Sequence, residues 1–284
     1  MRILMLAALL VVTPVLAGTP YVAKKRCPIG GERFDHVETV SYSTWGARPD
    51  GKPYGSWEFP LALPVCPGNR LVMYRDFTPD EVARLKPMVA STTYRALASE
   101  TPYYRAAWLA RTLDPASDEA LGLLYRAIWE SDDDPARRAR YLRTYVAAVA
   151  ALPASDEIGS IGLRARAANA LRELGDFDAA AAALAALPVA SLDVPVPAPR
   201  GKPVPGSTGV TVENYAEIEA AKQRRGLLGY TRNLGVVIAR RDASAEPVDM
   251  IPRNIAADRC AGPPRRTDAP CTAILADAAK LTAK

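Results

Sequence analysis

The chain has 284 residues, of which 49% are hydrophobic, and this suffices for the buried core of one large or two modest domains. Its 36 basic and 31 acidic side chains give a formal charge of +5, and no basic run is longer than the three residues 24–26, the others being pairs such as residues 265–266. Such a weak and dispersed charge argues against nucleic acid as a partner and permits only weak attraction to anionic envelope surfaces.

Residues 1–17 have the parts of a secretory signal peptide in the expected order. A positively charged start precedes an apolar run at residues 3–16, and Val15 and Ala17 supply small side chains at the cleavage point. The run is shorter than the roughly 20 residues that cross a bilayer, and no cysteine follows it at a lipid-attachment position. We therefore expect a periplasmic or secreted protein with no membrane-spanning segment after cleavage.

Residues 18–77 are rich in aromatic and β-branched side chains set among glycine and proline, which is typical of short strands and turns. Val37, Thr39 and Ser41 alternate with Glu38, Val40 and Tyr42, and residues 70–74 form a second short extended run. Residues 49–51 and 53–55 have the composition of turns and suit a hairpin. We expect a small β-rich module here.

The pattern changes at Thr78. Followed by Pro79 and Glu81, it combines an N-cap, a proline at the first helical position and an acid at the third, so a helix should begin there. Apolar residues then recur at helical spacing up to residue 174, separated by short polar breaks. Such short connections join antiparallel neighbours, so residues 78–188 should form stacked helical hairpins. The predicted fold class is mainly α with a small β-rich N-terminal module.

One of these hairpins, residues 166–188, resembles a tetratricopeptide repeat. The small, large and turn positions of the repeat fall on Ala168, Leu171 and Gly175. The packing positions of its second helix fall on Phe177, Ala180 and Leu184. A single hairpin cannot bury its own apolar face, and the preceding helices would supply its neighbours. An ordinary alanine-rich hairpin is the alternative.

The rest of the chain is less regular. Residues 189–210 are rich in proline and valine, which predicts an extended linker with little secondary structure. The C-terminal segment, residues 211–284, should hold a helical stretch at residues 213–240, interrupted at Gly226 and Gly229, and a proline-rich tail with a short helix at residues 272–280. The side chains expected to be buried in the helical stretch are Tyr215, Ile218, Leu228, Leu234 and Ile238.

Four cysteines remain after the predicted cleavage, namely Cys27, Cys66, Cys260 and Cys271. An even number in an exported chain favours two disulfides over a metal site, although four cysteines allow three pairings. Cys260 and Cys271 flank a short loop of glycine, prolines and arginines, so a bond between them would hold the C-terminal tail. Cys27 and Cys66 bracket the β-rich module.

The strings CPIGG at Cys27 and CPGNR at Cys66, followed by the repeat-like helices, resemble an uncharacterised bacterial family with a two-knuckle CPxCG zinc ribbon before a tetratricopeptide-like array. Here Gly30 and Asn69 stand where the second and fourth cysteines of that family would be. Two thiolates cannot close a tetrahedral zinc site, and a single histidine, His36, does not complete one. The resemblance therefore implies a degenerate zinc ribbon in which Cys27 and Cys66 form a disulfide, with no metal or other cofactor.

Catalytic motifs are scarce. The string WGAR at Trp45 resembles the start of the amidase fold of peptidoglycan recognition proteins, but those enzymes bind zinc through two histidines and a cysteine, and this chain has only His36. No GxSxG motif and no phosphate- or dinucleotide-binding glycine motif occurs. Acidic residues at 80–81, 118–119 and 132–134 lie at expected helix starts, where carboxylates stabilise the helix dipole. We therefore expect no enzymatic activity.

The expected function is binding. Stacked helical hairpins offer a surface that suits a protein or peptide partner in the cell envelope, and we prefer this interpretation. Trp45, Trp57 and Tyr54 are candidate binding residues because aromatic side chains near turns can stack on a ligand, and the β-rich module could instead bind envelope polysaccharide or peptidoglycan through them. A third alternative is an immunity or inhibitor protein that occupies the active site of a secreted toxin.

Overall fold

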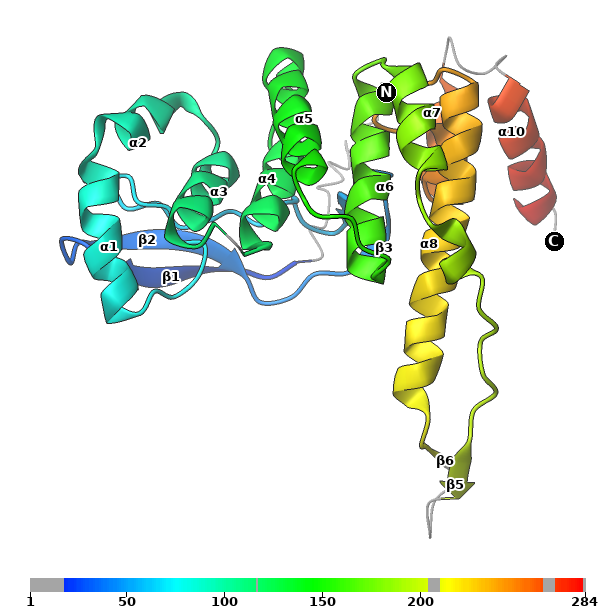
Figure 1. The fold of residues 1–284 in the computed structure, drawn as a ribbon, viewed down its shortest axis with the longest axis horizontal. Helices are drawn as coiled ribbons and strands as arrows, with labels where there is room; N and C mark the ends of the chain where they lie inside the picture. The colour runs from blue at the N-terminus through cyan, green and yellow to red at the C-terminus, as the bar shows by residue number, and fades with distance from the viewer. Residues whose placement is uncertain (1–17, 116, 204–209, 263–268, 283–284) are drawn as a thin grey trace, which may run out of the picture.

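A computed structural model of the chain describes residues 18–115, 117–203, 210–262 and 269–282. Two short hairpins lead into a series of helices, which confirms the mainly α fold class with a small β-rich N-terminal region (Figure 1). The predicted signal peptide lies outside the described residues. No described helix is long and apolar enough to cross a membrane.

The N-terminal module consists of two antiparallel hairpins. The first pairs β1 (Pro20–Arg26) with β2 (Arg33–Thr39) along their full length, and the second pairs β3 (Thr44–Ala47) with β4 (Pro53–Gly55). The turn predicted at residues 49–51 joins β3 to β4, whereas residues 53–55, which have turn composition, form β4 itself. Sequence alternation did not identify β1, because its second half is a run of three basic residues.

The extended run predicted at residues 70–74 is not a strand. It makes one isolated bridge, between Val65 and Val72. Arg70 has a φ of 63°, which turns the chain sharply at the start of this run. Because of this bend, the chain around Arg70 does not form a continuous strand.

Helices follow in the order that the apolar spacing predicts, and α3 to α8 each pack against the next in chain order. The first of them are α1 (Pro79–Ala90), α2 (Thr92–Ala96), the 3₁₀ turn η1 (Leu97–Ser99), α3 (Pro102–Leu113), α4 (Glu119–Trp129) and α5 (Pro135–Ala150). Thr78 and Glu81 form the predicted capping box at the start of α1. Thr101 and Asp134 cap α3 and α5 with their side chains alone, each directly before a proline.

The repeat-like hairpin is formed by α6 (Ile158–Glu173) and α7 (Phe177–Ala185). Gly175 has a φ of 81°, and its N–H donates to the carbonyl of Arg172. The N–H of Asp176 donates to the carbonyl of Leu171, so α6 ends in a Schellman motif that requires glycine at this position. Ala168 and Ala180 are fully buried between the helices, as the repeat-like spacing predicts.

One hydrophobic core joins the module to the helices. Cys27, Cys66 and Leu71 belong to the same buried cluster as the apolar side chains of α1 to α5. Aromatic side chains fill much of this core, with Tyr104 stacked on Tyr141 at 4.4 Å between ring centroids. The module therefore packs as part of the helical body.

The segment predicted as an extended linker contains more secondary structure than expected. It holds the 3₁₀ turn η2 (Val189–Leu192), where Leu192 is buried, and β5 (Gly201–Pro203), which pairs with β6 (Val210–Val212). Helix α8 (Tyr215–Ala239) follows without the predicted interruption at Gly226 and Gly229. A glycine in a helix costs only about 1 kcal/mol relative to alanine, which packing along the rest of α8 outweighs.

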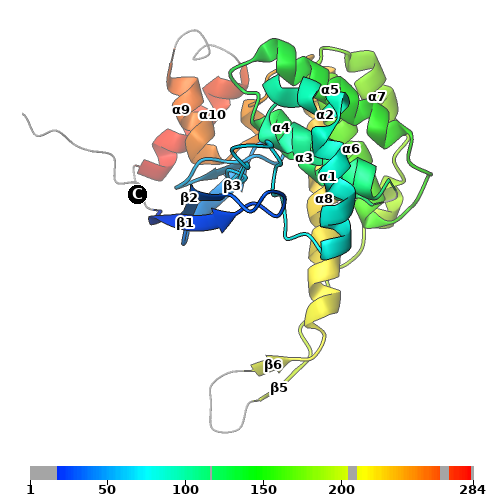
Figure 2. The ribbon, with the colours of Figure 1, turned by 90° about the vertical axis from the view of Figure 1, so that its left-hand side faces the viewer.

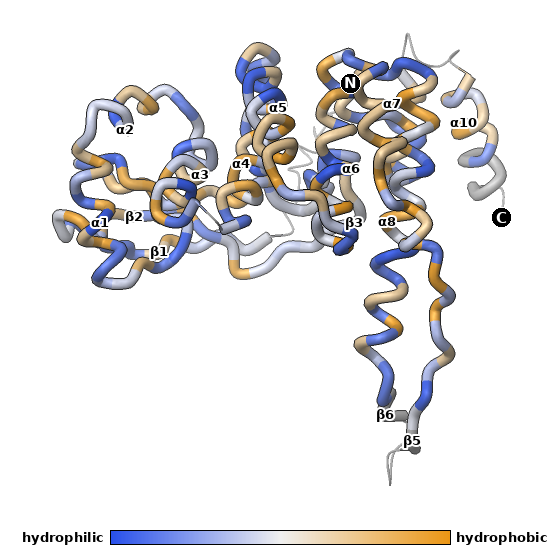
Figure 3. The backbone as a smooth tube through the Cα atoms, viewed as in Figure 1, coloured by the Kyte–Doolittle hydropathy of each residue, from blue (hydrophilic) through white to orange (hydrophobic). Residues whose placement is uncertain are grey.

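The β5–β6 hairpin and the first turns of α8 project from the helical body (Figures 1 and 2). Tyr215, predicted to be buried, is 63% exposed because it begins the projecting end of the helix. Ile218, Leu228, Leu234 and Ile238 are buried as predicted. A hydrophilic band at residues 222–225 crosses α8 between the projecting end and the body (Figure 3).

The C-terminal region is more helical than the sequence indicated. After the 3₁₀ turn η3 (Val248–Met250) come α9 (Arg253–Ala261), which was not predicted, and α10 (Ala269–Thr282), which begins before the expected residue 272. Helix α9 has little apolar periodicity, and its buried residues Ala256 and Cys260 pack on Cys271 of α10. Tertiary contact and a disulfide, rather than helix pattern, order this region.

Candidate functional site

A groove of about 1110 Å³ opens on the N-terminal module. Its walls are residues 37–39 at the end of β2, Trp45 on β3, Gly55 at the end of β4, and residues 56–58 and 60–62 after it. Trp45 and Trp57, both predicted as binding residues, line this one groove, and Trp45 is 47% exposed. The structure therefore brings together two of the three candidate binding residues.

The turn between β3 and β4 fixes the position of Trp45. The N–H of Arg48 donates to the carbonyl of Lys52 at 2.9 Å, and the N–H of Gly51 donates to the carbonyl of Arg48 at 2.8 Å. Gly46 has a φ of 128° and lies against Pro252, where a Cβ atom would come within 2.3 Å of the proline ring. The glycine next to Trp45 is therefore required by its conformation and by this close contact.

Trp57 is held from the opposite side of the groove. Its ring lies against Gly18, where a Cβ atom would come within 2.5 Å of a ring carbon. The neighbouring Phe59 makes an edge-to-face contact with Tyr42, with 5.1 Å between the ring centroids. These contacts order the segment after β4 without covering Trp45.

Exposed apolar side chains gather on this module. Most of the exposed large apolar side chains among the described residues belong to the module: Tyr21, Val22, Val37, Val40, Tyr42 and Trp45. The others are Tyr215 and Val236, both on α8. Isolated exposed apolar residues are ordinary, whereas a concentration in one region marks an interaction surface. The groove and this concentration belong to the same module.

The charged groups that line the groove are acidic. Glu38 receives hydrogen bonds from Lys25 and Tyr21, and these hold the pKa of its carboxyl below the usual value. Glu58 is exposed, and no basic residue lines the groove. Because Glu38 stays ionised, it can accept hydrogen bonds from a bound molecule but has no proton to donate at neutral pH.

Tyr54, the third candidate binding residue, does not line the groove. Its hydroxyl donates to Glu246 at 2.9 Å, and its ring packs on the cluster around the Cys260–Cys271 disulfide. Burial raises the pKa of Tyr54, and the hydrogen bond to Glu246 raises it further by a smaller amount. The structure thus places Tyr54 between the N-terminal module and the C-terminal helices.

Glu246 stabilises this contact in a way that depends on pH. Burial alone would raise the pKa of Glu246, but hydrogen bonds from Arg259 and Tyr54 lower it. A carboxyl with a lowered folded-state pKa stabilises the fold above its unfolded pKa of about 4, and this stabilisation is lost as the pH falls through the folded value. We expect Glu246→Gln to lower the free energy of unfolding by about 0.5–1 kcal/mol at neutral pH and to have almost no effect near pH 3, measured by urea unfolding. A difference that persists unchanged into acid would contradict this.

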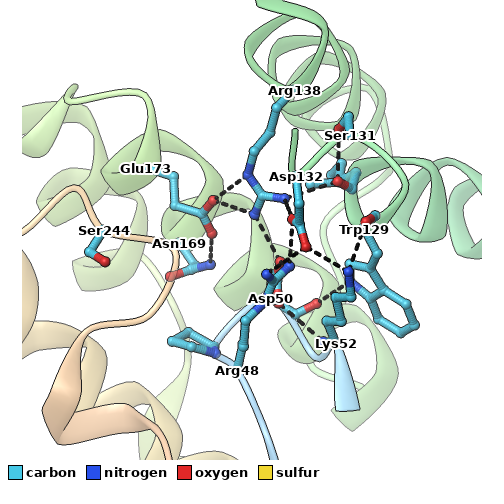
Figure 4. A network of polar contacts seen from close by, with 12 residues as sticks. Arg48, Asp50, Lys52, Trp129, Ser131, Asp132, Arg138, Asn169, Glu173 and Ser244 are labelled. Carbon is cyan, nitrogen blue, oxygen red and sulfur yellow. Dashed lines mark hydrogen bonds and ion pairs between the residues drawn. The ribbon is translucent and has the colours of Figure 1, made fainter. Parts of the chain in front are cut away.

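A buried network of charged residues fastens the β3–β4 hairpin to the helices (Figure 4). Arg48 donates to both Asp50 carboxylate oxygens, at 3.0 and 2.5 Å, and to both oxygens of Asp132, at 2.9 and 3.1 Å. Lys52 also donates to Asp132, at 2.6 Å. Asp132 therefore does not serve the helix-start role expected of it, and Asp134 alone caps α5.

Arg138 extends the network to α6. It donates to Asp50 at 2.8 Å, to Asp132 at 2.8 Å and to Glu173 at 2.7 Å. Burial would raise the pKa of Asp132, but the hydrogen bonds and charge of Arg48 lower it. Three basic and three acidic side chains thus neutralise one another in a largely buried site.

Arg172 carries the connection on to the C-terminal region. Its side chain is fully buried, and it donates to the side-chain oxygen of Asn169 and to the carbonyls of Asp242 and Ser244. Burial lowers its pKa, in contrast to Arg48. Sequence pattern does not reveal this role, because Arg172 reaches, beyond the nearby Asn169, two main-chain carbonyls about seventy residues away.

Both predicted disulfides, Cys27–Cys66 and Cys260–Cys271, are present, with Cα–Cα distances of 5.7 and 5.1 Å. Cys27 and Cys66 each begin a turn, and the two turns have the same hydrogen-bond pattern. The carbonyl of Cys27 accepts from the N–H of Gly31 at 3.2 Å, and that of Cys66 from the N–H of Arg70 at 3.0 Å. Each turn thus carries one cysteine into the core, where the two sulfurs meet.

Asn69, at the position of the missing fourth cysteine, bridges the two turns. Its amide donates to the carbonyl of Ile29 at 2.8 Å, and its oxygen accepts from the N–H of Leu71 at 2.9 Å. The sole histidine, His36, donates through Nε2 to the carbonyl of Ala62 at 3.2 Å. Within the described residues, no group of three or more His, Cys, Asp or Glu side chains is placed to hold a metal ion.

Comparison with profiles of known protein families, with curated proteins and with solved structures found no match. The groove on the N-terminal module is therefore interpreted from its own residues.

Proposed function

We propose that this is an exported, non-catalytic binding protein whose protein or peptide partner contacts the groove at Trp45 and Trp57. The observation that carries the proposal is the open groove lined by these two indole rings, in the module that also holds most of the exposed apolar side chains. Aromatic side chains dominate the energy of many protein interfaces. The helical body would then act as the support of this module, through the shared core and the buried network, rather than as the binding surface itself.

Export and a periplasmic location are supported by the signal-like residues 1–17 and by the two disulfides, which persist in an oxidising compartment. A tetratricopeptide-like origin of α6 and α7 is supported by their capped glycine turn and alanine packing.

The test is capture of the partner with tagged protein comprising residues 18–284, purified with its disulfides intact. We expect wild-type protein to retain a stoichiometric partner from envelope extract, and Trp45→Ala to weaken that complex by about 10- to 30-fold, which corresponds to one interface hot spot. The measurement is titration of the recovered partner against each purified variant.

The matched control is Tyr215→Ala, which removes another exposed aromatic side chain, at the far end of α8. It should leave the affinity within about twofold of wild type. Equal loss in the two variants, or no loss in Trp45→Ala, would contradict a binding site at the groove. Circular dichroism of each variant separates loss of binding from loss of fold.

Envelope polysaccharide is the second candidate ligand, and the same groove favours it. Exposed indole rings stack on sugar rings, and Glu38, Ser56 and Glu58 could accept hydrogen bonds from hydroxyl groups. Sedimentation with purified peptidoglycan distinguishes the two ligands. Co-sedimentation that is lost in Trp45→Ala, together with no protein partner in the capture experiment, would establish the polysaccharide instead.

A further inference from the structure

We infer that the groove binds an extended peptide strand that adds to β2 as the third strand of the β1–β2 sheet. This inference rests on the proposed function, since it specifies how the partner occupies the same groove. The sheet has two strands in the described part of the chain, so the side of β2 that faces away from β1 has no strand paired with it. Such an edge is a template for strand addition.

The groove lies along this edge of β2. Val37, Glu38 and Thr39 are consecutive, and all three line it. Successive side chains of a strand point to opposite faces, so a groove that contacts three in a row runs beside the strand rather than over one face. The opposite wall is formed by residues 55–58 and 60–62; it touches β2 at one end, where His36 donates to the carbonyl of Ala62, and the groove beside Val37 to Thr39 has a volume of about 1110 Å³, enough for a short extended segment.

The hydrogen-bond pattern shows which main-chain groups face the groove. The N–H of Val40 donates to the carbonyl of Thr19, and the N–H of Cys27 donates to the carbonyl of Glu32. In an antiparallel pair, main-chain groups point alternately toward and away from the partner strand. Even-numbered residues of β2 therefore bond to β1, and Val37 and Thr39 direct their N–H and carbonyl groups outward, beside the groove.

The two edges of the sheet differ in how strongly their residues discourage pairing with a further strand. β1 begins with Pro20 and ends with three consecutive basic residues, features that discourage strand pairing. β2 contains neither proline nor lysine; its charged residues Arg33 and Asp35 lie in its first half, and the part that lines the groove, Val37 to Thr39, has one, Glu38. The less protected edge is thus the one that lines the groove.

The charges specify the chemistry of the peptide. Glu58 lines the groove without a basic partner among its lining residues, Glu38 lines it while also paired with Lys25, and the indole rings of Trp45 and Trp57 attract cations over their faces. A strand that alternates apolar residues with lysine or arginine satisfies both features. A second copy of this chain fits less well, because pairing of two β2 edges would bring these acidic grooves together.

The probe is a fluorescent peptide of about nine residues that alternates lysine and valine, titrated by anisotropy against disulfide-intact protein of residues 18–284. The two key variants are Val37→Pro and Val22→Pro. Val37 and Val22 face each other across the sheet, are 57% and 56% exposed, and both direct their N–H away from the partner strand. Proline removes that N–H in each case.

We expect Val37→Pro to weaken binding about tenfold or more, and Val22→Pro to stay within about twofold of wild type. Val37→Thr keeps the N–H and should bind nearly as well as wild type. Equal effects of the two prolines, a loss in Val37→Thr as large as in Val37→Pro, or no binding of the peptide to wild type would each overturn strand addition. The proposed function fails separately, if the captured partner is insensitive to Trp45→Ala.

Discussion

Replacing Asp50 with asparagine is expected to lower the free energy of unfolding by about 3–5 kcal/mol. The side chain of Asp50 is 1% exposed and accepts hydrogen bonds from Arg48, Arg138 and the N–H of Lys52. Asparagine would place an amide N–H₂ against these donors and leave two buried guanidinium groups short of one negative charge. Urea unfolding at neutral pH, followed by circular dichroism, measures the loss.

Asp35→Asn is the matched control for this substitution. Asp35 also pairs with a basic residue, Lys24 at 2.6 Å, but both side chains are more than half exposed. Exposed ion pairs contribute little, so its effect should stay below about 1 kcal/mol. Similar small losses in both variants would show that the buried network does not hold the β3–β4 hairpin on the helices.

This network also marks the limit of what the sequence could predict. Arg48 and Asp132 are 84 positions apart, and each has a plausible local interpretation, one within the WGAR string and the other before a helix. Spacing along a chain gives no sign of a charge pair formed by tertiary packing. The same limit applies to Tyr54, whose turn-like surroundings resemble those of Trp45 but whose hydroxyl meets Glu246, 192 positions later.

Features set by neighbouring residues were predictable. The capping box at Thr78 and the glycine turn at Gly175 depend on contacts within a few positions, and both are found where the sequence placed them. Helix α9 lacked such signals because its order comes from Cys260 and its bond to Cys271. Trp45 and Trp57 could be selected as candidates, but only the folded hairpin shows that they line one groove beside an unpaired strand.

Loss of the Cys27–Cys66 disulfide is the second large effect that we expect. Cys27→Ser with Cys66→Ser should lower the free energy of unfolding by about 4 kcal/mol, because the bond closes a loop between residues 39 positions apart. Cys260→Ser with Cys271→Ser should cost about 3 kcal/mol, since its loop spans 11 positions. Urea unfolding of the oxidised double variants measures both values.

The cores in which the two bonds lie add to this difference between them. Cys27 and Cys66 lie in the core that joins the N-terminal module to α1–α5, so their loss would loosen the groove as well as the module. The Cys260–Cys271 bond joins α9 to α10 in a separate small cluster that touches the module through Tyr54, so its loss should weaken peptide binding at the groove less than loss of Cys27–Cys66. Wild-type protein unfolded in the presence of a reductant is the control, and it should lose at least as much stability as the more affected variant. A larger loss from the C-terminal pair, or two free thiols at Cys27 and Cys66 in protein isolated from the periplasm, would contradict the role given to this bond.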